Sequence, residues 1–129
     1  MEKIAECECG NLSISVDGDP YVLICGCDSC QRRTGSAFGM SAYYNKSDVL
    51  STRGPSSQYT RDSQFAKKIT FSFCPNCGTS LFWSLESRPD SIGVAVGCFV
   101  GQDFALPRSA HHLADMPEWL VLSEDIRIR

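Results

Sequence analysis

Residues 73–78 read FCPNCG, and residues 7–10 read CECG. Each stretch puts two cysteines into one turn of the chain, which fills half of a tetrahedral zinc site. The glycine that ends each turn permits a positive φ, so backbone N–H groups can point at the sulfur atoms. The two turns together predict one closed, structural zinc site. Its ligands are Cys7, Cys9, Cys74 and Cys77.

This predicted site ties together two segments that lie far apart in the chain. If the metal is treated as a cross-link between Cys9 and Cys74, loop closure contributes about 4 kcal/mol to stability. The net stability of a folded protein is only roughly 5–15 kcal/mol. We therefore expect folding to depend on the four outer cysteines.

A third cluster, CGCDSC at residues 25–30, brings three more cysteines together. Zinc held by three protein ligands keeps its fourth position for water or a substrate atom. Cys25, Cys27 and Cys30 therefore predict a second, open zinc site at which chemistry can occur. The alternative is a purely structural second site, with its fourth ligand supplied by Cys98 or a histidine.

The sequence around this cluster predicts one short helix. Asp28 or Ser29 can cap its start, Asp28 and Gln31 have the spacing of a capping box, and Gly35 can end it. Cys30 would then lie near the positive end of the helix, which favours its thiolate form.

Four polar side chains of the same segment are candidates for substrate binding. Arg32 and Arg33 supply positive charge close to the thiolates. These cations, or the hydroxyls of Thr34 and Ser36, can bind a substrate carboxylate or a developing oxyanion. The structural alternative is that they form a solvated helix face.

Cysteine usage also bears on cellular location. The eight cysteines allow four disulfides as an alternative to metal, but disulfides rarely join residues i and i+2, and the opening MEKIAECEC contains no apolar signal segment. We therefore expect reduced thiols and a cytoplasmic protein. No apolar run approaches the ~20 residues of a membrane span. The net charge of −3 argues against a nucleic-acid partner or an anionic membrane surface.

Hydrophobic residues make up 43% of the chain, which is enough for the core of one domain spanning residues 1–129. Alternation of apolar and polar side chains predicts a mainly β fold of small antiparallel sheets, held together by the four-cysteine site. The predicted strands lie within residues 12–16, 21–24, 38–44, 65–73, 81–85 and 92–100. The turn signals between them fall at residues 18–20, 53–55, 75–78 and 88–90.

Other conspicuous residues have two interpretations each. Cys98 lies in the apolar run SIGVAVGCFV and is predicted to be a small core residue; the alternative is a nucleophile, as in the methionine-R-sulfoxide reductases. His111 and His112 would point to opposite faces of a strand, so at most one can approach a metal. Five aromatic residues are predicted to form core or pocket wall. They are Phe71, Phe73, Phe82, Trp83 and Trp119.

The order of four stretches, CECG, CGCDSCQRRTGSAF, FCPNCGTSLFW and PRSAHHLADMPEW, resembles the glutathione-dependent formaldehyde-activating enzyme family, which also includes the domain of centromere protein V. The resemblance runs from Cys7 to Trp119. It implies a β-tent fold, a structural zinc on the outer two clusters and a catalytic zinc on the middle three cysteines. It also implies a carbon–sulfur lyase reaction, in which the glutathione thiol adds to formaldehyde to give S-hydroxymethylglutathione.

The middle cluster departs from this family pattern at two positions. Gly26 stands where members commonly carry histidine, and Gln31 stands where arginine is frequent. The missing imidazole removes a possible proton shuttle or hydrogen-bond donor beside the metal. Two non-enzymatic alternatives are retained. One is a zinc-binding module, with both sites closed or the second zinc absent. The other is a centromere protein V-like role, which would need a basic extension that this chain does not show.

Overall fold

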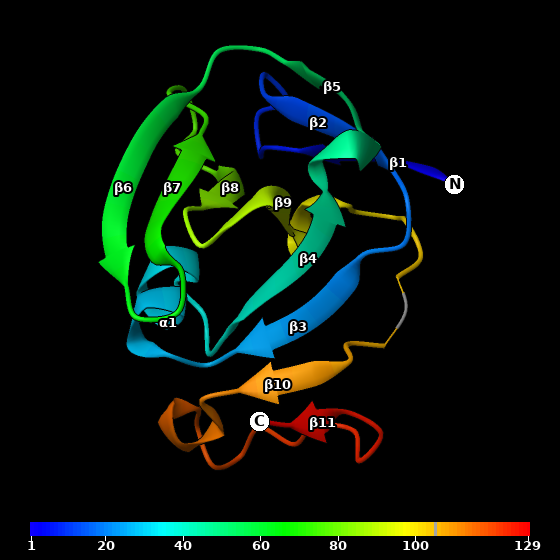
Figure 1. The fold of residues 1–129 in the computed structure, drawn as a ribbon. Helices are drawn as coiled ribbons and strands as arrows, with labels where there is room; N and C mark the ends of the chain where they lie inside the picture. Colours follow the sequence, from blue (N-terminus) through cyan, green and yellow to red (C-terminus); the bar gives the residue numbers. More distant parts are fainter. Residues whose placement is uncertain (105) are drawn as a thin grey trace.

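The computed structural model describes residues 1–104 and 106–129, which form two β-sheets and one α-helix (Figure 1). The smaller sheet has the strand order β1 (Glu2–Glu6), β2 (Ser13–Asp17) and β5 (Val49–Arg53). The larger sheet has the order β11 (Arg127–Ile128), β10 (Ser109–His111), β3 (Tyr21–Cys25), β4 (Gly39–Asn45), β9 (Arg88–Ala95), β8 (Ser80–Leu85), β7 (Lys67–Phe73) and β6 (Ser57–Ser63). The helical segments are α1 (Asp28–Thr34) and the 3₁₀ helices η1 (Lys46–Asp48), η2 (Val96–Cys98) and η3 (Leu113–Asp115).

Neighbouring strands pair antiparallel except at one edge of the larger sheet, where β10 runs parallel to both β3 and β11. The prediction of a mainly β fold with one short α-helix is confirmed. The prediction of small antiparallel sheets holds in part, because the three-stranded sheet fits it and the second sheet has eight strands and this parallel edge. Across the described ranges, no helix has the length and apolar character that crossing a bilayer requires.

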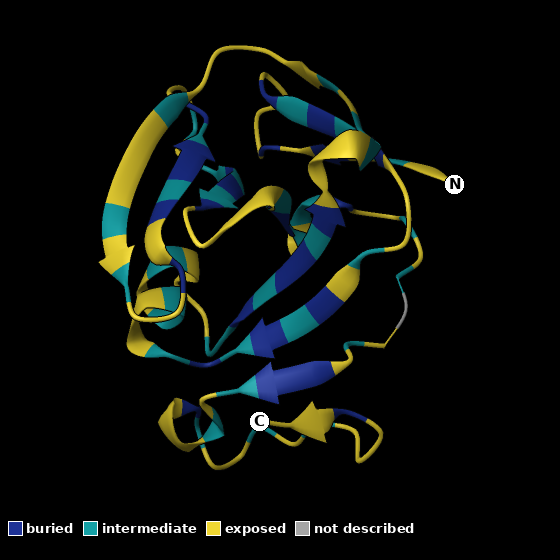
Figure 2. Cartoon of the chain, viewed as in Figure 1, coloured by how far each residue is buried: buried dark blue, intermediate teal, exposed yellow. Residues whose placement is uncertain are grey.

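The main core lies between the two sheets. On β2, Ile14 and Val16 are fully buried while the serines beside them are half-buried, which is the alternation expected of a strand with one face covered (Figure 2). These side chains pack in one cluster with Val22 of β3 and Val94 of β9. Burial of such apolar surface stabilises the fold by about 25 cal/mol per Å².

The opposite face of the larger sheet carries the candidate site. Tyr21, Leu23 and Cys25 share this face of β3, because side chains alternate along a strand. Strand pairing places Tyr43 of β4 beside Tyr21, and Gly39 beside Cys25. A second cluster, which includes the buried side chains of β7 and β8, packs against Tyr43 and covers this face farther along the sheet.

Three boundaries predicted from the sequence are wrong. The strand predicted over residues 65–73 begins at Lys67, because residues 64–66 form a turn. The turn signal at residues 88–90 is the start of β9, and the turn itself falls at residues 86–87, where the N–H groups of Glu86 and Ser87 donate to carbonyls of Lys68 and Ala66. The strand predicted over residues 92–100 ends at Ala95, because the chain then turns into η2.

The aromatic residues divide between core and surface. Phe71 and Trp83 are buried as predicted, and Phe73 and Phe82 are half-buried. Trp119 is 76% exposed, so its assignment to core or pocket wall is wrong. It follows η3 in a segment that forms no strand until β11, and no sheet covers it.

Candidate metal centres and the adjoining pocket

The four-cysteine cluster joins the two sheets. Cys7 and Cys9 follow β1 of the smaller sheet, and Cys74 and Cys77 lie in the turn between β7 and β8 of the larger one. The four Sγ atoms lie within 4.8 Å of one another, with 3.7 Å between Cys7 and Cys9 and 3.6 Å between Cys9 and Cys74. Four sulfurs around zinc at a Zn–S distance of about 2.3 Å are about 3.8 Å apart. The donor set and its spacing therefore fit zinc.

Both turns direct polar groups at these sulfurs. Leu12 donates its backbone N–H to Cys7 Sγ at 3.2 Å, and Gly10 and Gly78 both have φ of 81°, as the sequence predicted. The Thr79 hydroxyl lies 3.2 Å from Cys77 Sγ, and this hydrogen bond lowers the pKa of Cys77 to about 5. The contact thus favours the thiolate form of Cys77, and the thiolate is the form that binds metal.

The three-cysteine cluster lies where β3 ends and α1 begins. The Sγ atoms of Cys25, Cys27 and Cys30 are within 4.8 Å of one another, and all three residues are half-exposed. Within residues 1–104 and 106–129, neither Cys98 nor a histidine joins this group. The set can supply three ligands to a metal and leaves one side without a protein ligand from the described chain.

The start of α1 differs from the prediction that Asp28 or Ser29 caps it. The N-cap residue is Cys27, whose Sγ accepts the N–H of Cys30 at 3.4 Å. The helix therefore begins one position earlier than a conventional hydroxyl or carboxylate cap would place it, and the capping bond fixes the Cys27 sulfur. Gly35 ends the helix in the left-handed conformation, as predicted.

Arg33 places a positive charge beside the thiols. A hydrogen bond from Cys25, with the nearby Arg33 guanidinium as a further cause, lowers the pKa of Cys30 to about 5. The guanidinium lies 4.7 Å from the ring centre of Trp83 and 5.3 Å from that of Phe71, so two cation–π contacts hold it. A cation fixed in this way offsets part of the negative charge that several thiolates place together.

The other polar residues of this segment have different surroundings. Arg32 and Ser36 are exposed, and Thr34 donates its hydroxyl to the Cys30 carbonyl at 2.8 Å. The Thr34 hydroxyl hydrogen is therefore already used in a bond within the helix. Substrate binding by these residues stays a prediction.

Gly26 and Gln31, the two departures from the family pattern, both contact the segment that follows β10. A Cβ at Gly26 would lie 2.3 Å from Met116 Cγ and 2.9 Å from the His112 carbonyl oxygen. The Gln31 amide donates to the carbonyls of Gly26 at 2.8 Å and Asp115 at 2.6 Å. The C-terminal segment thus fills the space in which a larger residue 26 would stand. The predicted capping box of Gln31 with Asp28 is wrong, because Gln31 bonds this segment.

Replacing Gly26 with alanine is expected to lower the free energy of unfolding by about 1–3 kcal/mol, because the new methyl group overlaps Met116 and a backbone carbonyl. The measurement is urea unfolding of G26A, M116A and the double variant. Removing the Met116 side chain should recover part of the loss, so the double variant should be less destabilised than the sum of the single variants. Gly97→Ala is the matched control, since nothing lies within 4 Å of its added Cβ. If the destabilisation of the double variant equals the sum of the two single variants, the proposed overlap between residue 26 and Met116 is contradicted.

The histidines and Cys98 lie outside both clusters. His111 Nε2 is 3.0 Å from the Ser109 hydroxyl, which also accepts a hydrogen bond from Tyr21, and burial lowers the pKa of His111. His112 is exposed, with φ of 57°. Cys98 is half-buried against the main core, and burial raises the pKa of its thiol, which disfavours a nucleophilic role.

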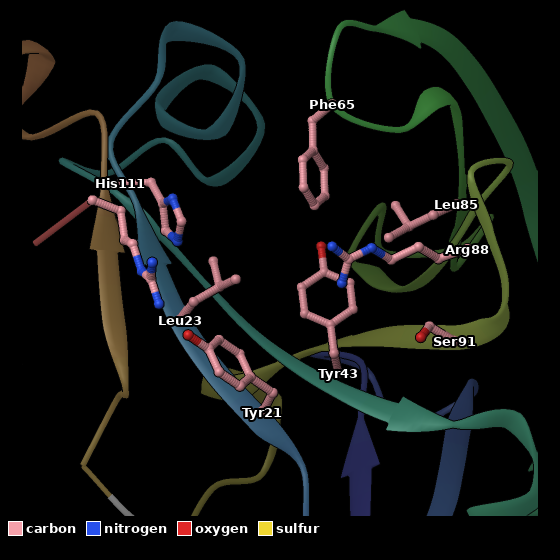
Figure 3. Close-up of a pocket in the computed structure, with 9 residues that line it drawn as sticks. Tyr21, Leu23, Tyr43, Phe65, Leu85, Arg88, Ser91 and His111 are labelled. Carbon is pink, nitrogen blue, oxygen red and sulfur yellow. The ribbon is translucent and has the colours of Figure 1, made fainter. Parts of the chain in front are cut away.

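A pocket of about 260 Å³ is lined by Leu23 and His111, which are neighbours of Cys25 on β3 and β10, but not by the cysteines themselves (Figure 3). One wall is formed by Tyr21 and Leu23, which share the face of β3 with Cys25, and by His111, which pairs with Cys25 in register. The facing wall includes Tyr43, and the Trp83 indole donates to its hydroxyl at 3.3 Å. Since Arg33 lies over that indole, a continuous set of contacts runs from Cys30 to the pocket.

Sequence reasoning did not single out Tyr21, Tyr43 or Arg88, which all line this pocket. A usable signal for Tyr21 was present, because residues 21, 23 and 25 must share one face of a strand that ends in the cluster. Arg88 gave no such signal, since its neighbours Pro89 and Asp90 are typical of a turn.

Comparison with solved structures finds a crystal structure of a protein from Rhodobacter sphaeroides, solved as a structural genomics target, with a TM-score of 0.60 and 25% sequence identity. The similarity covers 78% of this chain and 90% of the other. No curated protein matches the sequence. The model of one protein family, described as glutathione-dependent formaldehyde-activating enzyme, matches residues 2–115, which include all seven clustered cysteines. The chain therefore belongs to the glutathione-dependent formaldehyde-activating enzyme family.

Proposed function

We propose that the chain is a zinc-dependent carbon–sulfur lyase that joins the thiol of glutathione to formaldehyde, giving S-hydroxymethylglutathione. One observation carries the proposal: three half-exposed cysteine sulfurs converge within 4.8 Å, with no fourth ligand from the described residues. Membership of the family supports glutathione and formaldehyde as the substrates.

The two clusters take different roles in this proposal. Cys7, Cys9, Cys74 and Cys77 hold a structural zinc between the two sheets, and Cys25, Cys27 and Cys30 hold a second zinc with one open position. A zinc ion with an open position supplies Lewis-acid chemistry when bound, since it lowers the pKa of a thiol or water that reaches it. The four-cysteine cluster connects the two sheets, which supports a β-tent architecture and a single domain over residues 1–129.

The chain's own residues prepare this site. The capping bond fixes Cys27, and Arg33 offsets negative charge at Cys30. Tyr43 lines the pocket, and the buried Trp83 indole, which donates to its hydroxyl, supplies an apolar surface on which the Arg33 guanidinium lies. In the reaction the substrate sulfur forms a bond to the formaldehyde carbon, and the carbonyl oxygen takes up the proton that the thiol loses.

The test is the exchange of formaldehyde with glutathione, followed by NMR at equilibrium. The protein loaded with zinc should raise the exchange rate above the uncatalysed rate. An unchanged rate with glutathione and with other small thiols would contradict the lyase proposal and favour a zinc-binding module.

A further inference from the structure

The pocket beside the three-cysteine cluster carries positive charge that the proposed chemistry does not use. Arg88 enters it from the start of β9, and Arg129 enters it just after β11. Among the described residues that line the pocket, none is acidic, and neither arginine side chain forms an ion pair within the described chain. Two guanidinium groups without acidic partners in one pocket favour an anionic ligand, above all a carboxylate.

An aromatic ring of the pocket wall restrains Arg88. The Arg88 guanidinium lies 5.3 Å from the ring centre of Phe65, and Figure 3 shows both side chains on the wall that also carries Tyr43. On the facing wall, the Tyr21 hydroxyl donates to Ser109 at 3.0 Å. Stacking on an aromatic ring restricts a flexible arginine, so less entropy is lost when a ligand binds.

The spacing between pocket and cluster fits a short peptide. Leu23 lines the pocket and Cys25 belongs to the cluster, and two residues along a strand span about 6.6 Å. In an extended peptide, a carboxylate one or two residues from a cysteine lies about 4–7 Å along the chain. A carboxylate beside Leu23 and a sulfur at the cluster can therefore belong to one molecule, and Arg88 faces Leu23 across the pocket (Figure 3).

We infer that this pocket binds a carboxylate of the thiol substrate, with Arg88 as the principal contact and Arg129 as the second. This contact would make the site select, among small thiols, those that carry a carboxylate at least one residue from the thiol. A small neutral thiol such as 2-mercaptoethanol reaches the cluster without this contact. The inference rests on the proposed function for the placement of the substrate sulfur at the three-cysteine cluster. The placement of the substrate carboxylate rests on the pocket itself.

The experiment measures the binding of S-methylglutathione by isothermal titration calorimetry. This probe keeps both carboxylates of glutathione but has no thiol to deprotonate, so its binding does not require catalysis. Arg88→Gln should weaken binding about 5- to 10-fold, and Arg88→Lys, which keeps the charge but loses the planar two-pronged donor, should weaken it less. Raising the salt concentration should narrow the difference between wild type and Arg88→Gln.

Two controls separate this effect from a general loss of charge or fold. Arg53→Gln removes an exposed arginine of β5 in the other sheet and should leave affinity unchanged. The diester of S-methylglutathione should bind weakly and equally to wild type and Arg88→Gln. Equal affinity of S-methylglutathione for wild type, Arg88→Gln and Arg129→Gln, or no binding at millimolar concentration, would overturn the inference.

The inference and the proposed function can fail separately. If wild type and Arg88→Gln exchange formaldehyde with glutathione at the same kcat/KM, the proposed carboxylate contact is contradicted and the lyase proposal is not affected. Arg88-dependent binding of S-methylglutathione by a protein that accelerates no exchange would support the pocket and contradict the lyase proposal.

Discussion

Replacing Cys74 with serine is expected to lower the free energy of unfolding by about 4 kcal/mol, the loop-closure stabilisation of a cross-link of this span. Cys74 is fully buried between the sheets, and its sulfur lies 3.6 Å from that of Cys9, which is 65 residues earlier in the chain. Serine has nearly the same volume, so packing changes little and the loss of a metal ligand dominates. The melting temperature should fall by roughly 15 °C, and much of the variant should be insoluble.

Cys98→Ser is the matched control, because Cys98 is half-buried near the same cluster but is not one of its four sulfurs. Thermal unfolding of both variants in excess zinc measures the difference. A Cys74→Ser melting temperature within a few degrees of the Cys98→Ser value would contradict a structural role for the four-cysteine cluster.

Replacing Cys27 with serine is expected to leave the chain folded and to reduce formaldehyde–glutathione exchange by at least about 100-fold. Losses of 10- to 100-fold are typical when only an outer partner of a metal ligand is removed, and Cys27 is proposed to be a ligand itself. The fold should survive because Cys27 also caps α1, and a serine hydroxyl is a better N-cap acceptor than a thiol. The variant thus separates metal binding from helix formation.

Ser29→Ala provides the control in the same segment, since Ser29 is exposed and outside the cluster. It should retain exchange activity and melting temperature. If Cys27→Ser exchanges formaldehyde as fast as Ser29→Ala, the three-cysteine cluster takes no part in the reaction. If Cys27→Ser loses as much stability as Cys74→Ser, the two clusters do not have separate catalytic and structural roles.

The cysteine groupings could be predicted because a tetrahedral metal site constrains the spacing of its ligands along the chain. Ligands one or two positions apart must lie in one turn, and the spacing alone paired Cys7 and Cys9 with Cys74 and Cys77. Strands with one buried face, such as β2, were also visible because their alternation reflects burial directly.

Strands at sheet edges left weaker signals. The edge strand β6 is mostly exposed along its length, so its sequence SQYTRDS shows no apolar alternation, and it is defined by pairing with β7 (Figure 2). The short strand β10 depends on a parallel pairing with β3, a contact between distant segments that no local pattern encodes.

The details of the candidate site depended on tertiary contacts. Gly26 looks like a lost functional side chain in the sequence, yet the structure shows that Met116 occupies its space. The capping role of Cys27 was missed because cysteine is not among the usual cap residues. Arg88 lines the pocket only because the preceding turn falls two residues earlier than the proline suggests.

The central claim is that the three-cysteine cluster is an open metal site that accepts a thiol. The most direct test is the absorption spectrum of the cobalt(II)-substituted protein, titrated with glutathione. Sulfur that replaces water at an open position changes the ligand field, so the d–d bands should shift, and the shift should be absent in Cys27→Ser. Bands that stay unchanged in the wild-type protein at millimolar glutathione would contradict the claim.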